Sequence, residues 1–315
     1  MHHPQTMGNI PNLHSLYFAM LKASAIIAVH NGQAFIADAV RSVFAQTCKD
    51  LELIVVDDAS TDSTPDIVHK LMKTAPIPTL YLRNEKNLER CLSRNRGAAQ
   101  ATGKYLFFLD YDDVWQPDYI ESILHVFNET NADMVCSILR SKIDERGRII
   151  YTSSKVLPND VGILSCAALI GGTPGVAVQK ASFLQYSNAF CFREDWELVL
   201  RTFLSGQTIA IDDSDKVFVR EHGKRTSRAN PKYYHASLRI CKTYRQKIPP
   251  QYRPFFDFEI GSVALRYGDM WRGWKLVLSA LLRHSTLWQN PRNWLMLFKR
   301  GLRIDRWLSP SLRSQ

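Results

Sequence analysis

The sequence lacks the features that mark membrane-spanning, exported and repetitive proteins. No apolar segment reaches the roughly 20 uncharged residues that a spanning helix needs. The first residues do not combine a basic start with an apolar core, so no export signal is evident. There is no internal repeat and no low-complexity tract. At 315 residues and 45% hydrophobic content, the chain can bury one large core plus an appendage.

Paired cysteines and glycine-rich phosphate loops are missing as well. The six cysteines are scattered without a Cys-x-x-Cys pair, which argues against a zinc site or a disulfide framework and fits a reducing cytosol. No Gly-x-Gly-x-x-Gly follows a predicted strand, and no Gly-x-x-x-x-Gly-Lys-Ser/Thr occurs. If a diphosphate binds, a metal and side chains must hold it.

Apolar segments that alternate with amphipathic ones dominate the first third of the chain. Thr64 reads as a helix N-cap, because Pro65 and Asp66 follow it. The alternation predicts an α/β fold with a mostly parallel sheet covered by helices on both faces. The predicted strands are 23–29, 51–56, 79–82 and 104–109, and the predicted helices are 34–45, 64–73 and 89–101.

Polar residues follow three of these strands. Asn31 comes after the first, Asp57 and Asp58 after the second, and an acidic run from Asp110 to Asp113 after the fourth. In parallel sheets, ligands bind at the carboxyl ends of the strands, where these residues would meet. Carboxylates this close repel one another unless a cation such as Mg²⁺ or Mn²⁺ binds them. Taken alone, the acidic run would also fit a solvated turn; the three strand ends together predict a metal–diphosphate site.

The order and spacing of short motifs between about residues 22 and 230 resemble the family 2 glycosyltransferases, which have the GT-A fold. The resemblance rests on the motifs Ala28-Val29-His30-Asn31-Gly32, Ser42-Val43-Phe44-Ala45-Gln46-Thr47, Val55-Val56-Asp57-Asp58-Ala59-Ser60, Ser93-Arg94-Asn95-Arg96-Gly97, Leu109-Asp110-Tyr111-Asp112-Asp113 and Glu194-Asp195-Trp196-Glu197-Leu198.

The resemblance implies a site for a nucleotide-diphosphate sugar. Asp58 would accept a hydrogen bond from the ring N–H of a uracil-type base, and Ala28 and Asn31 would line the same pocket. Arg94 would lie near the nucleotide or its phosphates. Asp110 would belong to the nucleotide side of the Asp-x-Asp motif.

By the same resemblance, Asp112 and Asp113 would hold a Mn²⁺ or Mg²⁺ ion. His222 lies in a late loop whose residues approach the diphosphate or the metal in related enzymes. A surface role is the alternative for this histidine, and Lys224, Arg225 and Arg228 beside it would close over phosphates or be solvated.

Asp195 is the candidate general base. An acceptor hydroxyl has a very high pKa and needs a base to take its proton. The resemblance makes Asp195 this base in a single-displacement, inverting reaction, with Glu194 orienting the acceptor or the base. Both acids stand at the start of a predicted helix over 196–204, where acidic residues are favoured in any case. Residues 184–193 depart from the family pattern, so the sugar and the acceptor stay open.

The tail differs in character from the rest. The chain carries a formal charge of +10, which suggests an anionic partner. Beyond residue 267, tryptophans gather among arginines and lysines on predicted helices over 273–283 and 293–303. We expect a flexible extension over 1–21, a GT-A catalytic domain over 22–230 and a basic, Trp-rich helical region over 231–315. This region would touch an anionic membrane, or pack on the core or on a second copy in a homodimer.

The leading hypothesis is an inverting transferase at the cytoplasmic face of the cell membrane. It would move a monosaccharide from a nucleotide sugar to a glycan or lipid-linked acceptor during cell-surface polysaccharide synthesis, without a nucleic-acid partner. One alternative is a sugar nucleotidyltransferase, although His30-Asn31-Gly32-Gln33 is no glycine-rich phosphate loop. Another is a non-catalytic membrane- or nucleic-acid-binding protein on the same fold.

Overall fold

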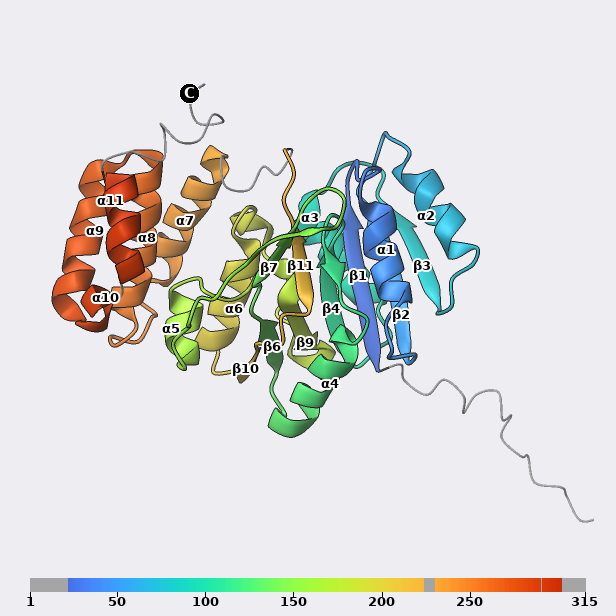
Figure 1. The fold of residues 1–315 in the computed structure, drawn as a ribbon, viewed down its shortest axis with the longest axis horizontal. Helices are drawn as coiled ribbons and strands as arrows, with labels where there is room; N and C mark the ends of the chain where they lie inside the picture. Colours follow the sequence, from blue (N-terminus) through green and yellow to red (C-terminus); the bar gives the residue numbers. More distant parts are fainter. Residues whose placement is uncertain (1–21, 224–229, 290, 302–315) are drawn as a thin grey trace, which may run out of the picture.

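A seven-stranded sheet forms the centre of the molecule (Figure 1). The computed structural model describes residues 22–223, 230–289 and 291–301, so the predicted extension over 1–21 lies outside the described residues. The strand order is β10-β6-β9-β4-β1-β2-β3. In chain order these strands are β1 (Ala23–Val29), β2 (Leu51–Asp57), β3 (Thr79–Arg83), β4 (Tyr105–Asp110), β6 (Met134–Ser137), β9 (Val176–Gln179) and β10 (Ile209–Asp212).

Most neighbouring strands of this sheet run parallel, as predicted. β1 lies between β2 and β4 and is parallel to both, β3 is parallel to β2, and β10 is parallel to β6. β9 runs antiparallel between β4 and β6. The register places Ala28 beside Asp110 and Val29 beside Asp57, so the carboxyl ends of the three central strands meet at one edge.

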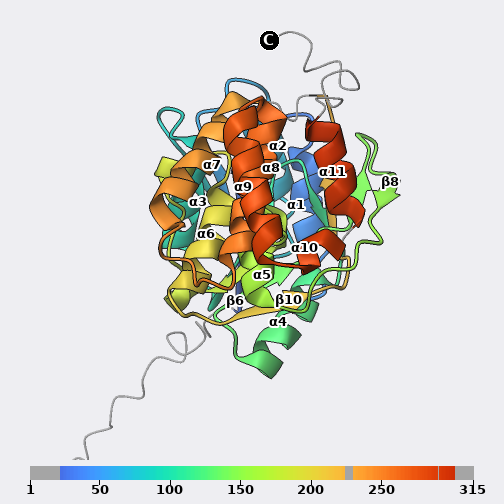
Figure 2. The same ribbon diagram turned by 90° about the vertical axis from the view of Figure 1, so that its left-hand side faces the viewer.

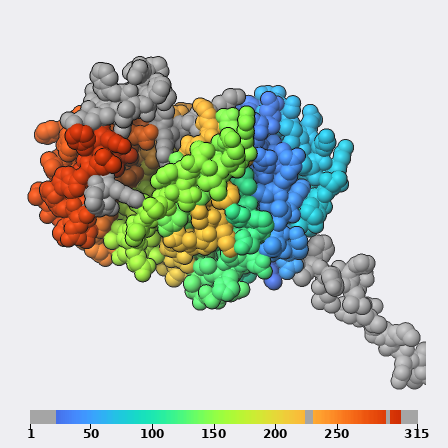
Figure 3. All heavy atoms as spheres, in the orientation of Figure 1, coloured from blue at the N-terminus to red at the C-terminus, as the bar shows by residue number. Residues whose placement is uncertain are grey.

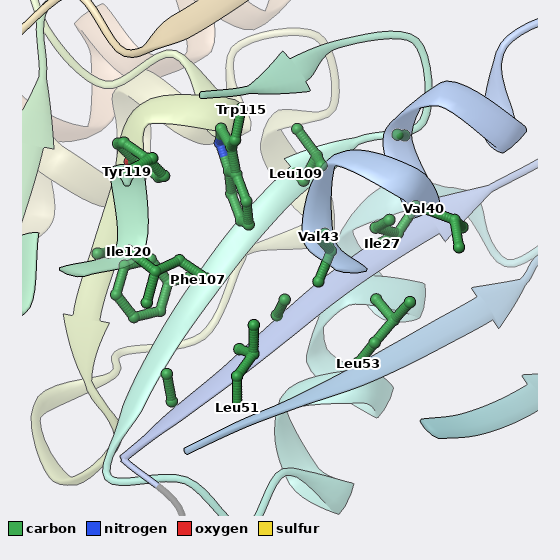
Figure 4. Packing of buried hydrophobic residues seen from close by; sticks show 14 of the residues in the cluster. Ile27, Val40, Val43, Leu51, Leu53, Phe107, Leu109, Trp115, Tyr119 and Ile120 are labelled. Atoms are coloured by element: carbon green, nitrogen blue, oxygen red, sulfur yellow. The ribbon is translucent and has the colours of Figure 1, made fainter. Parts of the chain in front are cut away.

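Helices cover both faces of the sheet, which confirms the predicted layering. Alternate residues of a strand point to opposite faces. Ile27 packs with the helices α1 and α4, whereas Ile26 packs toward α3 and α6. Figure 4 shows the first of these clusters, with Ile27, Leu53 and Phe107 of the sheet beside Val40, Val43 and Tyr119 of the helices. The covering helices are α1 (Ile36–Phe44), α2 (Thr64–Met72), α3 (Glu89–Gln100), α4 (Tyr119–Thr130), α5 (Val161–Cys166) and α6 (Glu194–Leu204).

Thr64 is not the N-cap that the sequence predicts. Helix α2 begins at Thr64 itself, and Ser63 occupies the N-cap position. The Thr64 hydroxyl accepts a hydrogen bond from the Gly32 N–H at 2.9 Å and donates one to Asp62 at 2.5 Å. This side chain therefore joins the loop after β1 to the loop after β2, at the edge where the polar residues gather.

A second, four-stranded sheet lies beside the first, and the sequence analysis does not anticipate it. Its order is β5-β11-β7-β8. The strands are β5 (Val114–Trp115), β7 (Ser141–Ile143), β8 (Ile149–Thr152) and β11 (Val217–Arg220). The chain around β7 and β8 crosses the front of the molecule in Figure 3. β11 leads directly to His222, so this sheet carries the late loop back to the carboxyl end of β4.

The C-terminal region is helical, as predicted. Its helices stand together at the end of the molecule remote from β3, and Figure 2 shows them face on. Trp196 and Leu200 of α6 share an apolar cluster with Ile240 and Phe256 of this region. The helices are α7 (Pro231–Tyr244), α8 (Arg253–Tyr267), α9 (Met270–Arg283), α10 (Thr286–Gln289) and α11 (Pro291–Gly301). The end of the predicted helix over 293–303, and the residues after it, lie outside the described residues.

Within the described part of the chain, we find no helix with both the length and the apolar character needed to cross a bilayer. Helix α8 is buried nearly all round, because α5, α7, α9 and α11 all pack on it. Its hydrophobicity is thus explained by packing inside the protein.

We predict that the C-terminal helices unfold together with the sheet domain. Phe256 is fully buried in the cluster that α6 and α8 share, so Phe256→Ala should lower the free energy of unfolding by about 3–5 kcal/mol. Denaturant unfolding followed by circular dichroism should show one transition at lower denaturant. The control is Trp271→Ala, whose side chain is 82% exposed and which should change stability by about 0.5 kcal/mol or less. Two separate transitions would show that the helices fold independently.

Candidate active site

A cavity of about 300 Å³ opens at the carboxyl ends of the central strands. It gathers side chains from β1, β4, α3, the loop after β2, the start of α6 and the loop after β11. Most of the residues predicted from the sequence line it, namely Ala28, Asp58, Arg94, Asp110, Asp112, Glu194, Asp195 and His222. Asn31 and Asp113 lie next to this lining and not in it.

The two acids that end β2 have different tasks. Asp57 is fully buried and its carboxylate accepts hydrogen bonds from the Ser60 N–H, the Tyr81 hydroxyl and the Arg83 guanidinium at 2.8, 2.5 and 2.6 Å. Asp58 faces the cavity, and its Oδ1 accepts from Asn84 at 2.7 Å and from the Leu88 N–H at 2.8 Å. Asp57 therefore stabilises the loop after β2, whereas Asp58 lines the cavity, where a ligand could reach it.

Asn31 shapes the same loop from the β1 side. Its backbone is left-handed, with φ 53°, and its Oδ1 accepts from the Thr61 N–H at 2.8 Å. Gly32 follows because a Cβ there would come within 2.5 Å of Val29 and 2.7 Å of Tyr111. Asn31 thus ties the loops after β1 and β2 together, and the nucleotide role predicted for it stays a prediction.

Three carboxylates crowd together after β4. Ligand oxygens of Asp110, Asp112 and Asp113 all lie within 4.8 Å of one another. The His222 ring contacts Asp112 Oδ2 at 2.9 Å, and Asp113 Oδ1 accepts from the Arg220 N–H at 2.8 Å. Oxygen donors in this density fit a hard divalent cation such as Mg²⁺ or Mn²⁺. The second sheet, through β11, is what brings His222 and Arg220 to this cluster.

Arg94 connects this cluster to the start of α6. Its guanidinium donates to Asp110 Oδ1 at 2.6 Å and to Glu194 Oε1 at 3.0 Å. Burial by itself lowers the pKa of Arg94, but the charges of Asp110 and Glu194 outweigh it and hold that pKa well above its ordinary value. Helix α3 comes close enough to β1 because Gly97 has no Cβ, which would lie 2.6 Å from Ile26. Arg94 is thus permanently charged and fixed between two acids.

Asp195 lies in the first turn of α6 and lines the cavity beside Glu194. Burial raises the pKa of Asp195 to about 6, and the neighbouring charge of Glu194 adds to the rise. Its Oδ1 accepts from the Trp196 N–H at 2.7 Å. A carboxylate with this pKa is ionised at neutral pH and still basic enough to accept a proton, as a general base must be.

The turn that carries Asp195 is fixed from the C-terminal helices. Arg193 is buried and forms an ion pair of 3.0 Å with Glu259 of α8. Its guanidinium also lies 4.1 Å above the Trp196 ring and contacts the Tyr233 hydroxyl of α7. Residues 231–315 are predicted from the sequence only as an appended helical region, and the local sequence does not predict these contacts.

Other residues of the site escaped the sequence analysis. The Tyr186 ring lies 5.2 Å from the Arg94 guanidinium, and Phe192 lines the cavity, with the Arg90 guanidinium 5.3 Å from its ring. The thiols of Cys91 and Cys191 lie 3.6 Å apart, although they are a hundred residues apart in sequence. Of these residues, only Arg90 could have been predicted from the sequence. It stands four positions before Arg94, which places both on the same face of the helix.

Comparisons with known proteins agree with this geometry. Residues 24–175 match the sequence model of Glycosyl transferase family 2. An uncharacterized glycosyltransferase of Nostoc sp. is 37% identical over 113 residues, which cover 35% of this chain and 34% of that protein. TuaG of Bacillus subtilis, a putative teichuronic acid biosynthesis glycosyltransferase, is 38% identical over 107 residues, 34% of this chain and 42% of that protein. The chain thus spans less than half the length of these two curated relatives.

Solved structures share the fold over a longer stretch. S. aureus TarS 1-349 in complex with UDP-GlcNAc covers 82% of this chain and 90% of its own, with a TM-score of 0.56 and 14% identity. Its complex with UDP covers 93% of this chain and 89% of its own, with a TM-score of 0.53 and 17% identity. The family match over residues 24–175, just under half of the chain, and the shared architecture confirm the resemblance to family 2 glycosyltransferases with a GT-A fold.

Proposed function

We propose that this protein is an inverting glycosyltransferase that moves a monosaccharide from a nucleotide-diphosphate sugar to a hydroxyl group. The observation that carries the proposal is the convergence of Asp58, Asp112 and Asp195 on one cavity from three separate segments. A UDP-sugar is the donor we favour, since the fold is that of a protein solved with UDP-GlcNAc. The resemblance to TuaG supports an acceptor from cell-surface polysaccharide synthesis, either a glycan or a lipid-linked sugar.

The donor would lie across the strand ends. Asp58, held by Asn84 and Leu88, would accept the base N–H, and Ala28 would line the base pocket from β1. The terminal nitrogens of Arg94 are already bonded to Asp110 and Glu194. We therefore assign Arg94 to positioning these acids. We expect its charge to attract the phosphates electrostatically, without a direct hydrogen bond to them.

Asp110, Asp112 and Asp113, with His222 beside them, would hold a Mn²⁺ or Mg²⁺ ion. When bound, the cation would offset the negative charge that grows on the departing diphosphate. The fit rests on the donor set, which is rich in carboxylate oxygens and has one histidine at its margin.

Asp195 would take the proton of the acceptor hydroxyl. The hydroxyl oxygen bonds to the anomeric carbon as the bond from that carbon to the phosphate oxygen breaks. The nucleoside diphosphate leaves with the electron pair, and the anomeric configuration inverts in this single displacement. Glu194 is held by Arg94 and would keep the start of α6, and thus Asp195, in place for the acceptor hydroxyl.

We also propose contact with an anionic membrane surface. Helix α9 exposes Trp271, Leu278 and Leu282 on one face, at helical spacing, with the exposed Lys275 on the same face. A second exposed apolar strip runs along α10 and α11 and consists of Trp288, Trp294, Leu295 and Phe298. Tryptophan with lysine on amphipathic helices suits the headgroup layer of anionic lipids. The protein would then meet a lipid-linked acceptor at the inner face of the cell membrane.

Replacing the base tests the mechanism. Asp195→Asn should lower transfer from UDP-GlcNAc, or from the UDP-sugar that proves active, by about 10²-fold or more. Binding of UDP with Mn²⁺, measured by calorimetry, should stay within about twofold, because Asp195 is assigned to the acceptor hydroxyl. The matched control is Asp269→Asn, the same change at the start of α9, where the carboxylate accepts from the Arg272 N–H. Normal turnover by Asp195→Asn would remove this residue from the mechanism.

The raised pKa of Asp195 predicts an acidic limb in the pH profile. The base works only when ionised, so kcat/KM should be level well above pH 6, reach half its maximum near pH 6 and fall about tenfold per pH unit well below it. UDP affinity measured across the same pH series separates loss of the base from loss of donor binding. A profile whose acidic limb lies near pH 4 would contradict the raised pKa.

Surface variants test the membrane contact. The double variant Trp294→Ser/Phe298→Ser should lower co-sedimentation with vesicles of anionic lipid by about fivefold or more, since two aromatic side chains leave the interface, while UDP affinity stays unchanged. The matched control is Ile149→Ser/Ile150→Ser, which removes two side chains of similar exposure from β8. If both double variants bind vesicles like the wild type, the strip has another partner; analytical ultracentrifugation then tells whether it is a second copy.

A further inference from the structure

Phe192 stands where two cavities meet. The first is the donor cavity described above, and the second, of about 410 Å³, extends from it between α6, β7, β11 and the loop over 168–172. Both cavities are lined by Phe192 and Asp195. The Phe192 ring and the candidate base therefore border both cavities.

The backbone of Phe192 is held in an unfavourable conformation. Its φ is 80°, in the left-handed region that a bulky residue rarely adopts. The Arg193 N–H donates to the Phe190 carbonyl at 2.9 Å, and the Cys191 thiol lies 3.2 Å from Asn188 Oδ1 and 3.6 Å from the Cys91 thiol. Contacts on both sides thus fix this turn, and backbone strain that is kept in place gathers at functional sites.

The Phe192 side chain is not core filling. It is partly buried, and it belongs to none of the hydrophobic clusters formed by the described residues. Cations lie near the ring, Arg90 at 5.3 Å and Lys232 at 5.6 Å from its centre. Both cations attract the electron-rich ring, and neither belongs to the lining of the second cavity. Core packing therefore does not account for a phenylalanine at this strained position.

Several charged side chains along the second cavity are held in ion pairs. Lys142 forms an ion pair with Glu221, and Arg140 forms one with Asp213, with one contact at 2.6 Å. Ion pairs offer hydrogen-bond donors and acceptors to a ligand. They add no net charge that would favour binding of a charged ligand. This pattern suits an uncharged ligand with many hydroxyl groups.

We propose that the second cavity binds the acceptor as an uncharged pyranose whose apolar ring face stacks on Phe192, with its reacting hydroxyl at Asp195. The inference rests on the proposed function and names the acceptor class for the same site. The C–H groups on one face of a pyranose carry slight positive charge and match the negative face of an aromatic ring. Phe192 is then a specificity-determining residue that separates donor from acceptor.

The test compares three variants of one residue. Phe192→Gly removes the ring and suits the left-handed backbone, so its melting temperature should equal or exceed that of the wild type. Phe192→Leu keeps apolar bulk without a flat face, and Phe192→Tyr keeps the face. Binding of a panel of methyl hexosides and methyl N-acetylhexosaminides to the protein with UDP and Mn²⁺ is followed by saturation-transfer NMR. Tyr151→Leu, on the exposed strand β8, is the matched control.

We expect at least one glycoside to bind the wild type, the Tyr151→Leu control and Phe192→Tyr. Its affinity should fall about tenfold or more in Phe192→Gly and Phe192→Leu, whereas UDP affinity, measured for each variant, should fall by less, because Phe192 only borders the donor cavity. Equal glycoside affinity in all variants would overturn the inference, and so would the absence of glycoside binding to a wild type that binds UDP. Failure of the wild type to bind UDP would overturn the proposed function, and the inference with it.

Discussion

The whole site depends on one buried guanidinium. Arg94 joins Asp110, at the end of β4, to Glu194, at the start of α6, and neither acid is close to it in sequence. Without that charge, carboxylates from two segments would face each other across a buried cavity at a large electrostatic cost. The guanidinium can be buried only because both acids neutralise its charge. These two ion pairs hold α3, β4 and α6 in place relative to one another. The absence of a Cβ at Gly97 is the steric condition for this arrangement.

A second constraint comes from the C-terminal helices. The turn that presents Asp195 is held from behind by the ion pair between Arg193 and Glu259 and by the stacking of Arg193 on Trp196. Deeper along α6, the buried Glu197 binds both Arg201 and the Tyr244 hydroxyl of α7. The position of the candidate base is therefore set jointly by the sheet domain and by helices that follow it in sequence. A membrane contact through α9 to α11 would thus be a second task for the C-terminal helices, which already support α6 by packing.

Much of the first half of the fold could be predicted from the sequence. Uninterrupted apolar strands separated by amphipathic helices have few other ways to bury their surfaces, and acids at strand ends in such a sheet meet at one edge. The failures have physical causes too. β9 and the second sheet consist of strands of two to four residues, too short to show a period. Thr64 looks like a cap in sequence, but its hydroxyl has a better partner in the N–H of Gly32, which only the folded chain brings near.

What the sequence determined by itself is the chemistry available and its approximate place: oxygen donors after β4, an acid pair at the start of α6, and no glycine loop for a diphosphate. The motif resemblance already singles out Asp58, and tertiary structure gives the physical reason: Asp57 is bonded to Tyr81 and Arg83, whereas Asp58 lines the cavity. Tertiary structure decided that Arg94 serves the acids, and that Phe192 stands between two cavities. Residue type and spacing determine local structural preferences. Contacts between residues a hundred positions apart, such as Arg94 and Glu194, are fixed only when the whole chain folds.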